Sequence, residues 1–154
     1  AEIADGWLPL YYSPYRQEVY ADQIKGAKPG FEIMQGLAVV VNDDVEAALQ
    51  PIKQNLALYI GGMGAKSRNF HNELVKRMGF EEAAEKIQNL FLEGRKDEAV
   101  AAVPTQLADE ISLVGSVDRI KDRLQAWRDT PVTSLLVSTR NKDQLRTFAE
   151  LVLG

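Results

Sequence analysis

The chain has 154 residues, of which 45% are hydrophobic and 26% charged, with a formal net charge of −4. These values are typical of a globular domain with a real core, and the acidic balance argues against a general nucleic-acid or anionic-membrane surface. The absence of cysteine excludes a disulfide framework, a thiolate metal site and a cysteine nucleophile. No apolar run approaches the roughly 18 residues of a membrane span, so we expect one structural unit, residues 1–154, in a cytoplasmic setting.

The first segment predicts two short elements joined by a loop. Residues 1–6 have the pattern of a helix end, from which we expect a piece of a longer polypeptide; a trimmed but complete small protein is the alternative. Residues 7–10 are short and apolar and predict a strand. Ser13 followed by Pro14 predicts the start of a helix that runs to about Lys25.

The strongest pattern in the chain is a buried strand followed by a capped helix. Residues 37–41 form an unbroken apolar run, which is typical of a strand covered on both faces. Asn42 and Asp43 follow, and their side chains can accept hydrogen bonds from the free amides at a helix start. We therefore interpret them as helix caps rather than as ligands of a bound molecule. A strand leading into a helix begins a βαβ unit, so the sequence predicts an α/β fold. The apolar face of the helix is Val45, Ala48, Leu49, Ile52, Leu56, Tyr59 and Ile60.

After this helix the pattern is mostly helical. The glycine-rich residues 61–64 end the helix and have the conformational freedom expected of a lid hinge. Residues 65–104 predict short helices in series, and Val117–Arg128 predicts a longer one. Residues 132–138 predict the second convincing strand, and residues 143–153 predict a closing helix. Two good strands and one weak strand would leave unpaired edges and an incomplete core.

Five segments carry a family likeness: residues 4–9, 58–64, 69–70, 77–80 and 113–118. In this order, over nearly the whole chain, they resemble the bacterial luciferase-like oxidoreductases, and most of all the deazaflavin-dependent branch related to methylenetetrahydromethanopterin reductase. The resemblance implies the carboxyl-terminal part of a (β/α)8 TIM barrel. It would contain about three parallel strands, namely residues 7–10, 33–41 and 132–138, with a helical insertion at residues 65–104 before the last strand.

The resemblance also implies an activity. The protein would be part of an oxidoreductase that uses a deazaflavin (coenzyme F-420) or FMN for hydride transfer to or from an organic substrate. An FMN- and oxygen-dependent monooxygenase is one alternative. A non-catalytic half-barrel that assembles with the missing amino-terminal half, or with a second copy of itself, is the other. Because most coenzyme-phosphate contacts would lie outside this chain, we expect the isolated piece to be inactive, and whether it holds a coenzyme stays open.

Barrel enzymes place their chemistry at the carboxyl ends of the strands, which selects the candidate coenzyme-binding residues. Tyr12 and Ser13 follow the first strand and can offer hydroxyls to a ring or phosphate; an aromatic loop with a helix cap is the alternative. Arg140 follows the last strand and can pair with a phosphate or the acidic tail of a deazaflavin. A solvated loop arginine is the alternative there.

The remaining candidates lie in the insertion or, for Met63, just before it. His71 is the only histidine and is the candidate catalytic proton donor for hydride transfer, with a plain helix-surface role as the alternative. Met63, Asn69 and Phe70 are candidate substrate-pocket residues, because the insertion can fold over the pocket mouth. No metal-ligand pattern is present in the sequence. The expected partners are a small-molecule substrate and the rest of the barrel or a second copy, rather than nucleic acid or a membrane.

Overall fold

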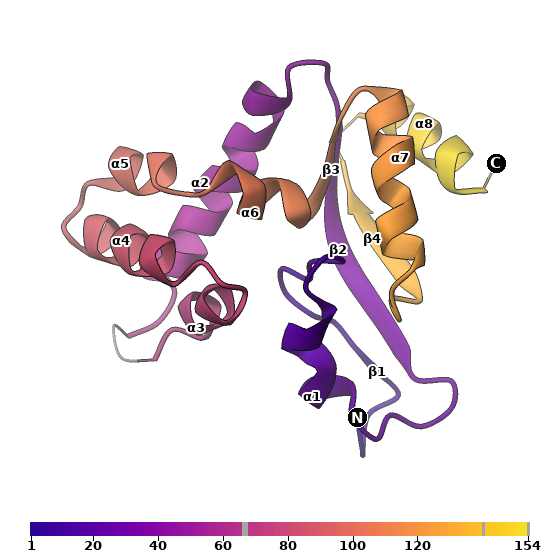
Figure 1. Ribbon diagram of the computed structural model, residues 1–154. Coiled ribbons are helices and arrows are strands. Elements are labelled where there is room, and N and C mark those ends of the chain that lie inside the picture. The colour runs from indigo at the N-terminus through magenta and orange to yellow at the C-terminus, as the bar shows by residue number, and fades with distance from the viewer. Residues whose placement is uncertain (66–67, 140, 154) are drawn as a thin grey trace. The chain divides into compact units, whose positions relative to one another are not determined.

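Strands and helices follow one another as an α/β fold requires (Figure 1). The structure is a computed structural model that describes residues 1–65, 68–139 and 141–153. Its elements in chain order are β1 (Gly6–Trp7), the 3-10 helix η1 (Gln17–Tyr20), α1 (Ala21–Ile24), β2 (Glu32–Val41), α2 (Val45–Gly62), α3 (Phe70–Arg77), α4 (Glu81–Leu92), α5 (Lys96–Ala101), α6 (Thr105–Glu110), β3 (Ser112–Gly115), α7 (Val117–Arg128), β4 (Ser134–Ser138) and α8 (Lys142–Leu153).

Contacts gather the chain into two compact units. The first, which we call the sheet unit, comprises Ala1–Ala48 and Glu110–Gly154. The second, the helical unit, comprises Leu49–Asp109. The chain leaves the sheet unit within α2 and returns to it at the last residue of α6, so each crossing lies in or at the end of a helix and no linker separates the units.

The sheet unit is built around β2, which pairs in parallel with all three other strands. It pairs with β1 through Glu32 and Ile33, with β4 through residues 34–38, and with β3 through residues 38–41. The predicted strand at residues 33–41 is therefore confirmed. Because all of these strands run the same way, their carboxyl ends point to one edge of the sheet.

The two faces of this sheet differ in burial. Leu37 and Val39 of β2 are 1% and 2% exposed. Val137 of β4 is in register with Leu37 and belongs to the same face, where α7 and α8 lie beside β4 (Figure 1). On the opposite face Leu136 is in register with Gly36 and is 53% exposed. Alternating side chains therefore separate a helix-covered face from a less covered one.

The expectation of about three strands is corrected to four. The additional strand is β3, whose four residues are all buried and pair with the end of β2. The sequence analysis predicted no strand in this segment. The segment has only two apolar residues, between Ser112 and Gly115, so its local pattern does not predict a strand. Its pairing with β2 shows that it is one.

The first strand is shorter than the predicted residues 7–10. It ends at Trp7, and Leu8 is 69% exposed. Pro9 cannot donate to a ladder, and Tyr11 has a positive φ of 54°, which no strand accommodates. The chain therefore leaves the sheet immediately after its two-residue pairing with β2.

The helix predicted from Ser13 starts later than expected. It appears as η1 continued by α1, and it ends at Ile24, close to the predicted Lys25. The Ser13 hydroxyl accepts from the Tyr15 amide at 3.2 Å, which forms a local turn. The same hydroxyl also donates to a distant carboxylate, described below, and this second bond holds residues 13–16 outside the regular helix.

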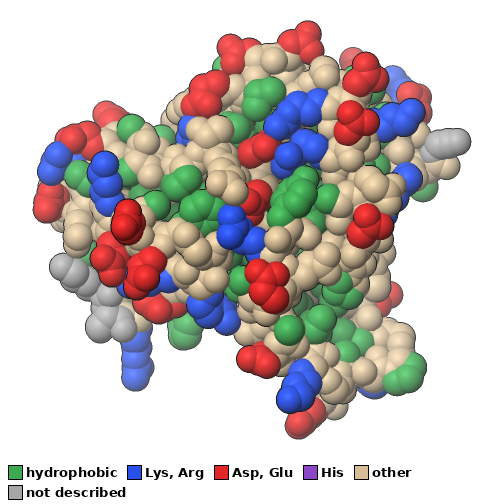
Figure 2. All heavy atoms as spheres, in the orientation of Figure 1, with side chains coloured by type: hydrophobic (Ala, Val, Ile, Leu, Met, Phe, Trp, Pro, Cys, Tyr) green, Lys and Arg blue, Asp and Glu red, His purple; other side chains and the backbone are tan. Residues whose placement is uncertain are grey.

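The helical unit confirms the predicted series of short helices, but they lie between β2 and β3 rather than directly before the last strand, β4. Its helix α4 contacts both α3 and α5. Leu56, Ile60, Val75, Ile87 and Leu107 form a core in which each side chain is fully buried. No helix within the described residues is long and apolar enough to cross a membrane. On the face shown in Figure 2, acidic and basic side chains are interspersed.

Candidate functional site

The loop after β1 forms a partly buried ion pair with Glu110, the last residue of α6. Glu110, which is 7% exposed, accepts hydrogen bonds from Arg16 Nε at 2.7 Å and Nη2 at 2.9 Å. The Oγ of Ser13, which is fully buried, donates to the same carboxylate at 3.0 Å. The hydrogen bond to Glu110 raises the pKa of Arg16 above its usual value, so the cation persists. We call Ser13, Arg16 and Glu110 the Glu110 brace.

Aromatic side chains hold the same loop from a second direction. The Tyr20 hydroxyl donates to the Tyr11 carbonyl at 2.8 Å and accepts from the Ser13 amide at 3.2 Å. Tyr12 stacks on Tyr20 with ring centroids 4.5 Å apart, and it also packs against Trp127 at 6.1 Å. Tyr11 is the non-glycine residue with positive φ within the described chain, a conformation that costs about 1–2 kcal/mol. The loop is thus fixed in a strained shape.

The predicted coenzyme contacts Tyr12 and Ser13 lie at this strand end but face the interior. Tyr12 is 1% exposed, and burial raises the pKa of its phenol. The Ser13 hydroxyl is bonded to Glu110. With the loop in this shape, these two side chains do not fit direct contacts to a coenzyme, and we derive no step through them. Their observed role is to shape the loop.

Capping residues occupy the carboxyl end of β2, as predicted. The Asn42 side chain accepts from the Asp44 amide, and the Asp44 side chain accepts from the Ala47 amide, each at 3.0 Å. The residue that caps α2 is therefore Asp44 rather than the predicted Asn42 and Asp43, and Asn42 forms a turn just before the helix. Asp43 is exposed between them. These bonds account for polar residues at this strand end without a ligand.

The other two strand ends are tied back to β2. The Asn42 amide donates to the Gly115 carbonyl at the end of β3, at 2.9 Å. After β4, Asn141 Oδ1 accepts from the Asp143 amide at 2.9 Å and starts α8, and Gln144 Nε2 donates to the Val41 carbonyl at 3.3 Å. The predicted phosphate ligand Arg140 lies outside the described residues.

In the helical unit, Asn69 joins the end of α2 to the start of α3. Its Oδ1 accepts from the amides of His71 and Asn72, each at 3.0 Å. Its Nδ2 donates to the carbonyls of Tyr59 at 3.0 Å and Ile60 at 2.8 Å. Both ends of the amide carry two bonds and the residue is 3% exposed, so the side chain is committed to structure.

The other predicted residues of the insertion differ widely in exposure. The His71 ring meets Tyr59 edge-on, with centroids 4.9 Å apart, and burial lowers the pKa of His71. The imidazole is therefore neutral near pH 7 rather than a ready cationic acid. Phe70 is 83% exposed and Met63 is 45% exposed. The structure keeps Asn69, Phe70 and His71 together at the start of α3.

The hinge expected at residues 61–64 is corrected in its first half. Gly61 and Gly62 are helical residues of α2, and a Cβ on either would collide with the Phe91 side chain of α4. The pair is glycine because α4 packs against the α2 backbone there. Only Gly64, with a φ of 119°, has the backbone conformation that needs glycine freedom.

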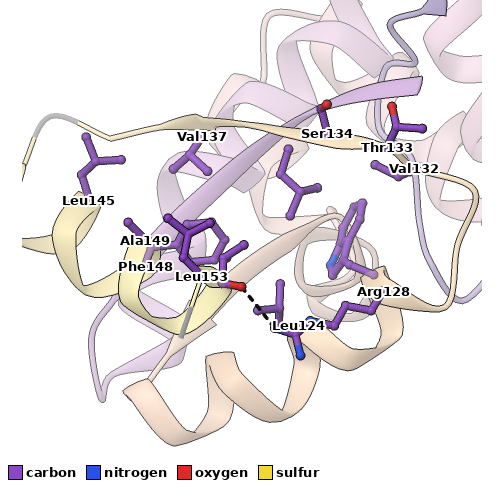
Figure 3. Close-up of a pocket in the computed structure, with 13 residues that line it drawn as sticks. Leu124, Arg128, Val132, Thr133, Ser134, Val137, Leu145, Phe148, Ala149 and Leu153 are labelled. Atoms are coloured by element: carbon purple, nitrogen blue, oxygen red, sulfur yellow. Dashed lines mark hydrogen bonds between the residues drawn. The ribbon is translucent and has the colours of Figure 1, made fainter. Parts of the chain in front are cut away.

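A groove of about 510 Å³ lies between β4, α7 and α8 (Figure 3). Its lining is mainly apolar, with Trp127 and Phe148 as its aromatic members, and Arg128 Nη2 donates across one end to the Val152 carbonyl at 3.4 Å. It follows the helix-covered face of β4 rather than its carboxyl end. Barrel chemistry occurs at the carboxyl ends, so we do not assign this groove to a reaction.

Sequence reasoning missed Glu110 and Arg16. They lie 94 residues apart in the chain, in segments without a motif. The sequence signal that could have identified Glu110 is its position directly before a short apolar segment. A carboxylate there is expected to be buried, and a buried carboxylate is rarely without a charged partner.

Comparison with known proteins identifies the family. A family model described as luciferase-like monooxygenase matches residues 1–134. The chain belongs to the luciferase-like monooxygenase family. Among curated members, a putative coenzyme F-420-dependent oxidoreductase of Mycobacterium tuberculosis is 40% identical over 161 aligned positions, covering 99% of this chain and 46% of that protein.

A solved structure shows how the luciferase-like chain folds. The coenzyme F-420-dependent tetrahydromethanopterin reductase from Methanopyrus kandleri matches with a TM-score of 0.67 and 23% identity, over 98% of this chain and 44% of that one. Together with the all-parallel pairing, this match shows the fold of part of a (β/α)8 barrel. The chain spans about half the length of the relatives that it matches.

Proposed function

We propose that this chain is part of an oxidoreductase that uses the deazaflavin coenzyme F-420 for hydride transfer to or from an organic substrate. The observation that carries the proposal is the 40% identity, over 99% of the chain, to a protein named as a coenzyme F-420-dependent oxidoreductase. The fold supports it, because the parallel strands deliver their loops to one edge, where barrel enzymes bind their substrates.

When bound, the coenzyme supplies the hydride chemistry. The chain's own contribution is to shape the loops around it. The Glu110 brace fixes the loop after β1, and the bond from the Asn42 amide to Gly115 fixes the ends of β2 and β3 against each other. We retain His71 as the proposed proton carrier, acting from its neutral imidazole, and Arg140 as the proposed partner of the acidic tail.

Titration of the 154-residue chain with deazaflavin and with FMN, followed by fluorescence, tests the proposal. We expect saturable deazaflavin binding and weaker FMN binding. Tighter binding of FMN would favour an FMN- and oxygen-dependent monooxygenase instead. Binding of neither would count against coenzyme use by this chain.

Arg140→Gln sharpens the titration, and Lys142→Gln is its matched control, since it removes a neighbouring cation. If Arg140 pairs with the acidic tail, its loss weakens deazaflavin binding about tenfold and leaves FMN binding unchanged, because one hydrogen bond to a charged group contributes about 1.5–3 kcal/mol. An equal loss in both variants would indicate general charge attraction.

The second candidate is a non-catalytic half-barrel that assembles with a second copy or with the rest of a barrel. One observation favours it: Leu136 of β4 is 53% exposed, and in the described part of the chain β4 pairs with β2 alone. Light scattering after size exclusion tests this candidate. A dimer that Leu136→Lys dissociates would support it, with Leu92→Lys as control because Leu92 is 51% exposed in the helical unit. A wild-type monomer would count against it.

A further inference from the structure

We infer that Glu110 is a positioning residue for the loop after β1, residues 8–16. Through Ser13 and Arg16 it holds the strained backbone at Tyr11 in place, at the strand end where the proposed coenzyme would lie. That the loop belongs to a coenzyme site rests on the proposed function, but the first measurement that tests the inference needs no coenzyme.

The first step is that Glu110 ties the loop to the sheet. It is the residue at which the chain returns to the sheet unit, and Ser112, two residues later, pairs with Ala38 of β2. A carboxylate this close to a paired strand has little freedom to move. Arg16 approaches it in a two-bond geometry that fixes direction as well as distance. The loop is therefore anchored to the sheet through Glu110, in addition to its contacts with its own short helix.

The second step is that two contacts converge on Ser13. Its side chain donates to Glu110, and its amide donates to the Tyr20 hydroxyl, which also bonds the Tyr11 carbonyl. Ser13 is thus held on its side chain by the brace and on its backbone by Tyr20. A non-glycine residue with positive φ persists only when its surroundings over-determine it. Tyr11 lies two residues before Ser13, within the span that these two contacts fix.

The third step is that burial distinguishes this pair from the other two-bond pair of the described chain. Arg95 also donates two bonds to one carboxylate, that of Glu98, at 2.7 Å and 2.6 Å. That pair is exposed, so water replaces either partner on removal. Glu110 is 7% exposed and Ser13 is fully buried, so without Glu110 the Ser13 hydroxyl loses a partner that water does not readily replace, while the partly exposed Arg16 loses both of its bonds to the carboxylate.

Hydrogen exchange of the intact chain, read by mass spectrometry on peptides covering residues 8–20, tests the inference. The reporting amides are those of Ser13, Tyr15 and Arg16, which donate within the loop. We expect Glu110→Gln to accelerate exchange of these peptides about tenfold or more, and to leave peptides of α4 unchanged. Glu98→Gln, which disrupts the exposed pair, is the matched control and leaves the loop unchanged.

Ser13→Ala is the second variant, because Glu110→Gln can destabilise the whole fold. It removes one bond to the carboxylate and the acceptor of the Tyr15 amide, and it keeps the ion pair. Apart from the Tyr15 amide, we therefore expect a smaller acceleration confined to the same peptides. Loop exchange equal to wild type in Glu110→Gln overturns the inference. So does an equal acceleration of all peptides in both variants, which would make the brace a general stabiliser.

Deazaflavin titration of the same variants separates the two proposals. If wild type binds and Glu110→Gln binds at least about tenfold more weakly, while Glu98→Gln binds normally, the loop positions the coenzyme site. If wild type does not bind, the proposed function fails for this chain, and the exchange result still decides the role of Glu110. If wild type binds and Glu110→Gln binds equally well, the brace does not position that site and the inference is overturned.

Discussion

Within each of the two units, side-chain hydrogen bonds join separate segments of the chain, but the chemistry of these bonds differs. In the helical unit, the neutral amides of Asn69 and Asn72 bridge helix ends through bonds to backbone groups within 12 residues of the chain. In the sheet unit, a charged pair joins Arg16 to Glu110 across 94 residues. The neutral amides bond to backbone groups that are near in the sequence. The ion pair joins two residues that only the fold brings together, and each partner depends on the other because the site is partly buried.

The units also differ in how completely they cover their apolar residues. In the helical unit, Leu56, Ile60 and Leu107 are fully buried. In the sheet unit, Leu136 of β4 stays half exposed while Leu37, one strand away on the opposite face, is 1% exposed. In the sheet unit the buried and the exposed apolar side chains therefore lie on opposite faces of one sheet.

The largest expected effect comes from contrasting the two faces of the sheet. Leu37→Ala removes a fully buried side chain and should lower the free energy of unfolding by about 2–5 kcal/mol. Leu136→Ala should lower it by about 0.5 kcal/mol, because water already reaches that side chain. Urea unfolding followed by circular dichroism measures both. Similar losses for the two variants would mean that the Leu136 face is covered, for example by self-assembly.

Next in size is the close packing of α2 on α4. Gly62→Ala places a Cβ against the Phe91 ring and should lower the free energy of unfolding by about 1–3 kcal/mol. The control is Gly36→Ala in the sheet unit, where a Cβ meets nothing within 4 Å and φ is not positive. Adding Phe91→Leu to Gly62→Ala should recover part of the loss, because leucine lacks the outer ring atoms that the new Cβ would meet. If the second change deepened the loss by its full single-variant value, the collision would not be its cause.

A smaller effect compares a buried cap with an exposed one. Asn69→Ala removes four bonds at the junction of α2 and α3 and should cost about 1–2 kcal/mol. Asn69→Asp keeps the acceptor for the α3 amides and loses both donors, so its cost should be intermediate. Asn141→Ala, at the exposed start of α8, should cost about 0.5–1 kcal/mol. An equal cost at both caps would remove the distinction between the units.

The sequence predicted those parts of the fold whose causes are local. The apolar run of β2 and the start of a helix after its polar residues each depend on a few neighbouring residues, and both β2 and α2 are confirmed. The strand β3 was missed because four residues carry no periodicity, and its burial depends on pairing with residues 38–41. A strand of that length is defined by its neighbour.

The candidate site follows the same rule. The strand ends that carry Tyr12, Ser13 and Asn42 were found from the order of elements alone. The orientation of Tyr12 and Ser13 was not, because it depends on Glu110, whose partner lies 94 residues away. Residue type indicated what each side chain can do, while the long-range pairing decided which way it points.

The smallest expected effect concerns the single histidine, in the helical unit. Burial lowers the pKa of His71 below its unfolded value of about 6.5, so the folded state binds fewer protons than the unfolded state between the two pKa values. The free energy of unfolding should therefore fall slightly as the pH drops through about 6.5, and the loss should be complete below the folded pKa. NMR titration of the one imidazole gives the folded pKa without assignment, and Tyr59→Ala should move it upward by exposing the ring edge. A midpoint at or above 6.5 in wild type would show that the ring is solvated, and His71 would then be a better proton donor than its packing against Tyr59 indicates.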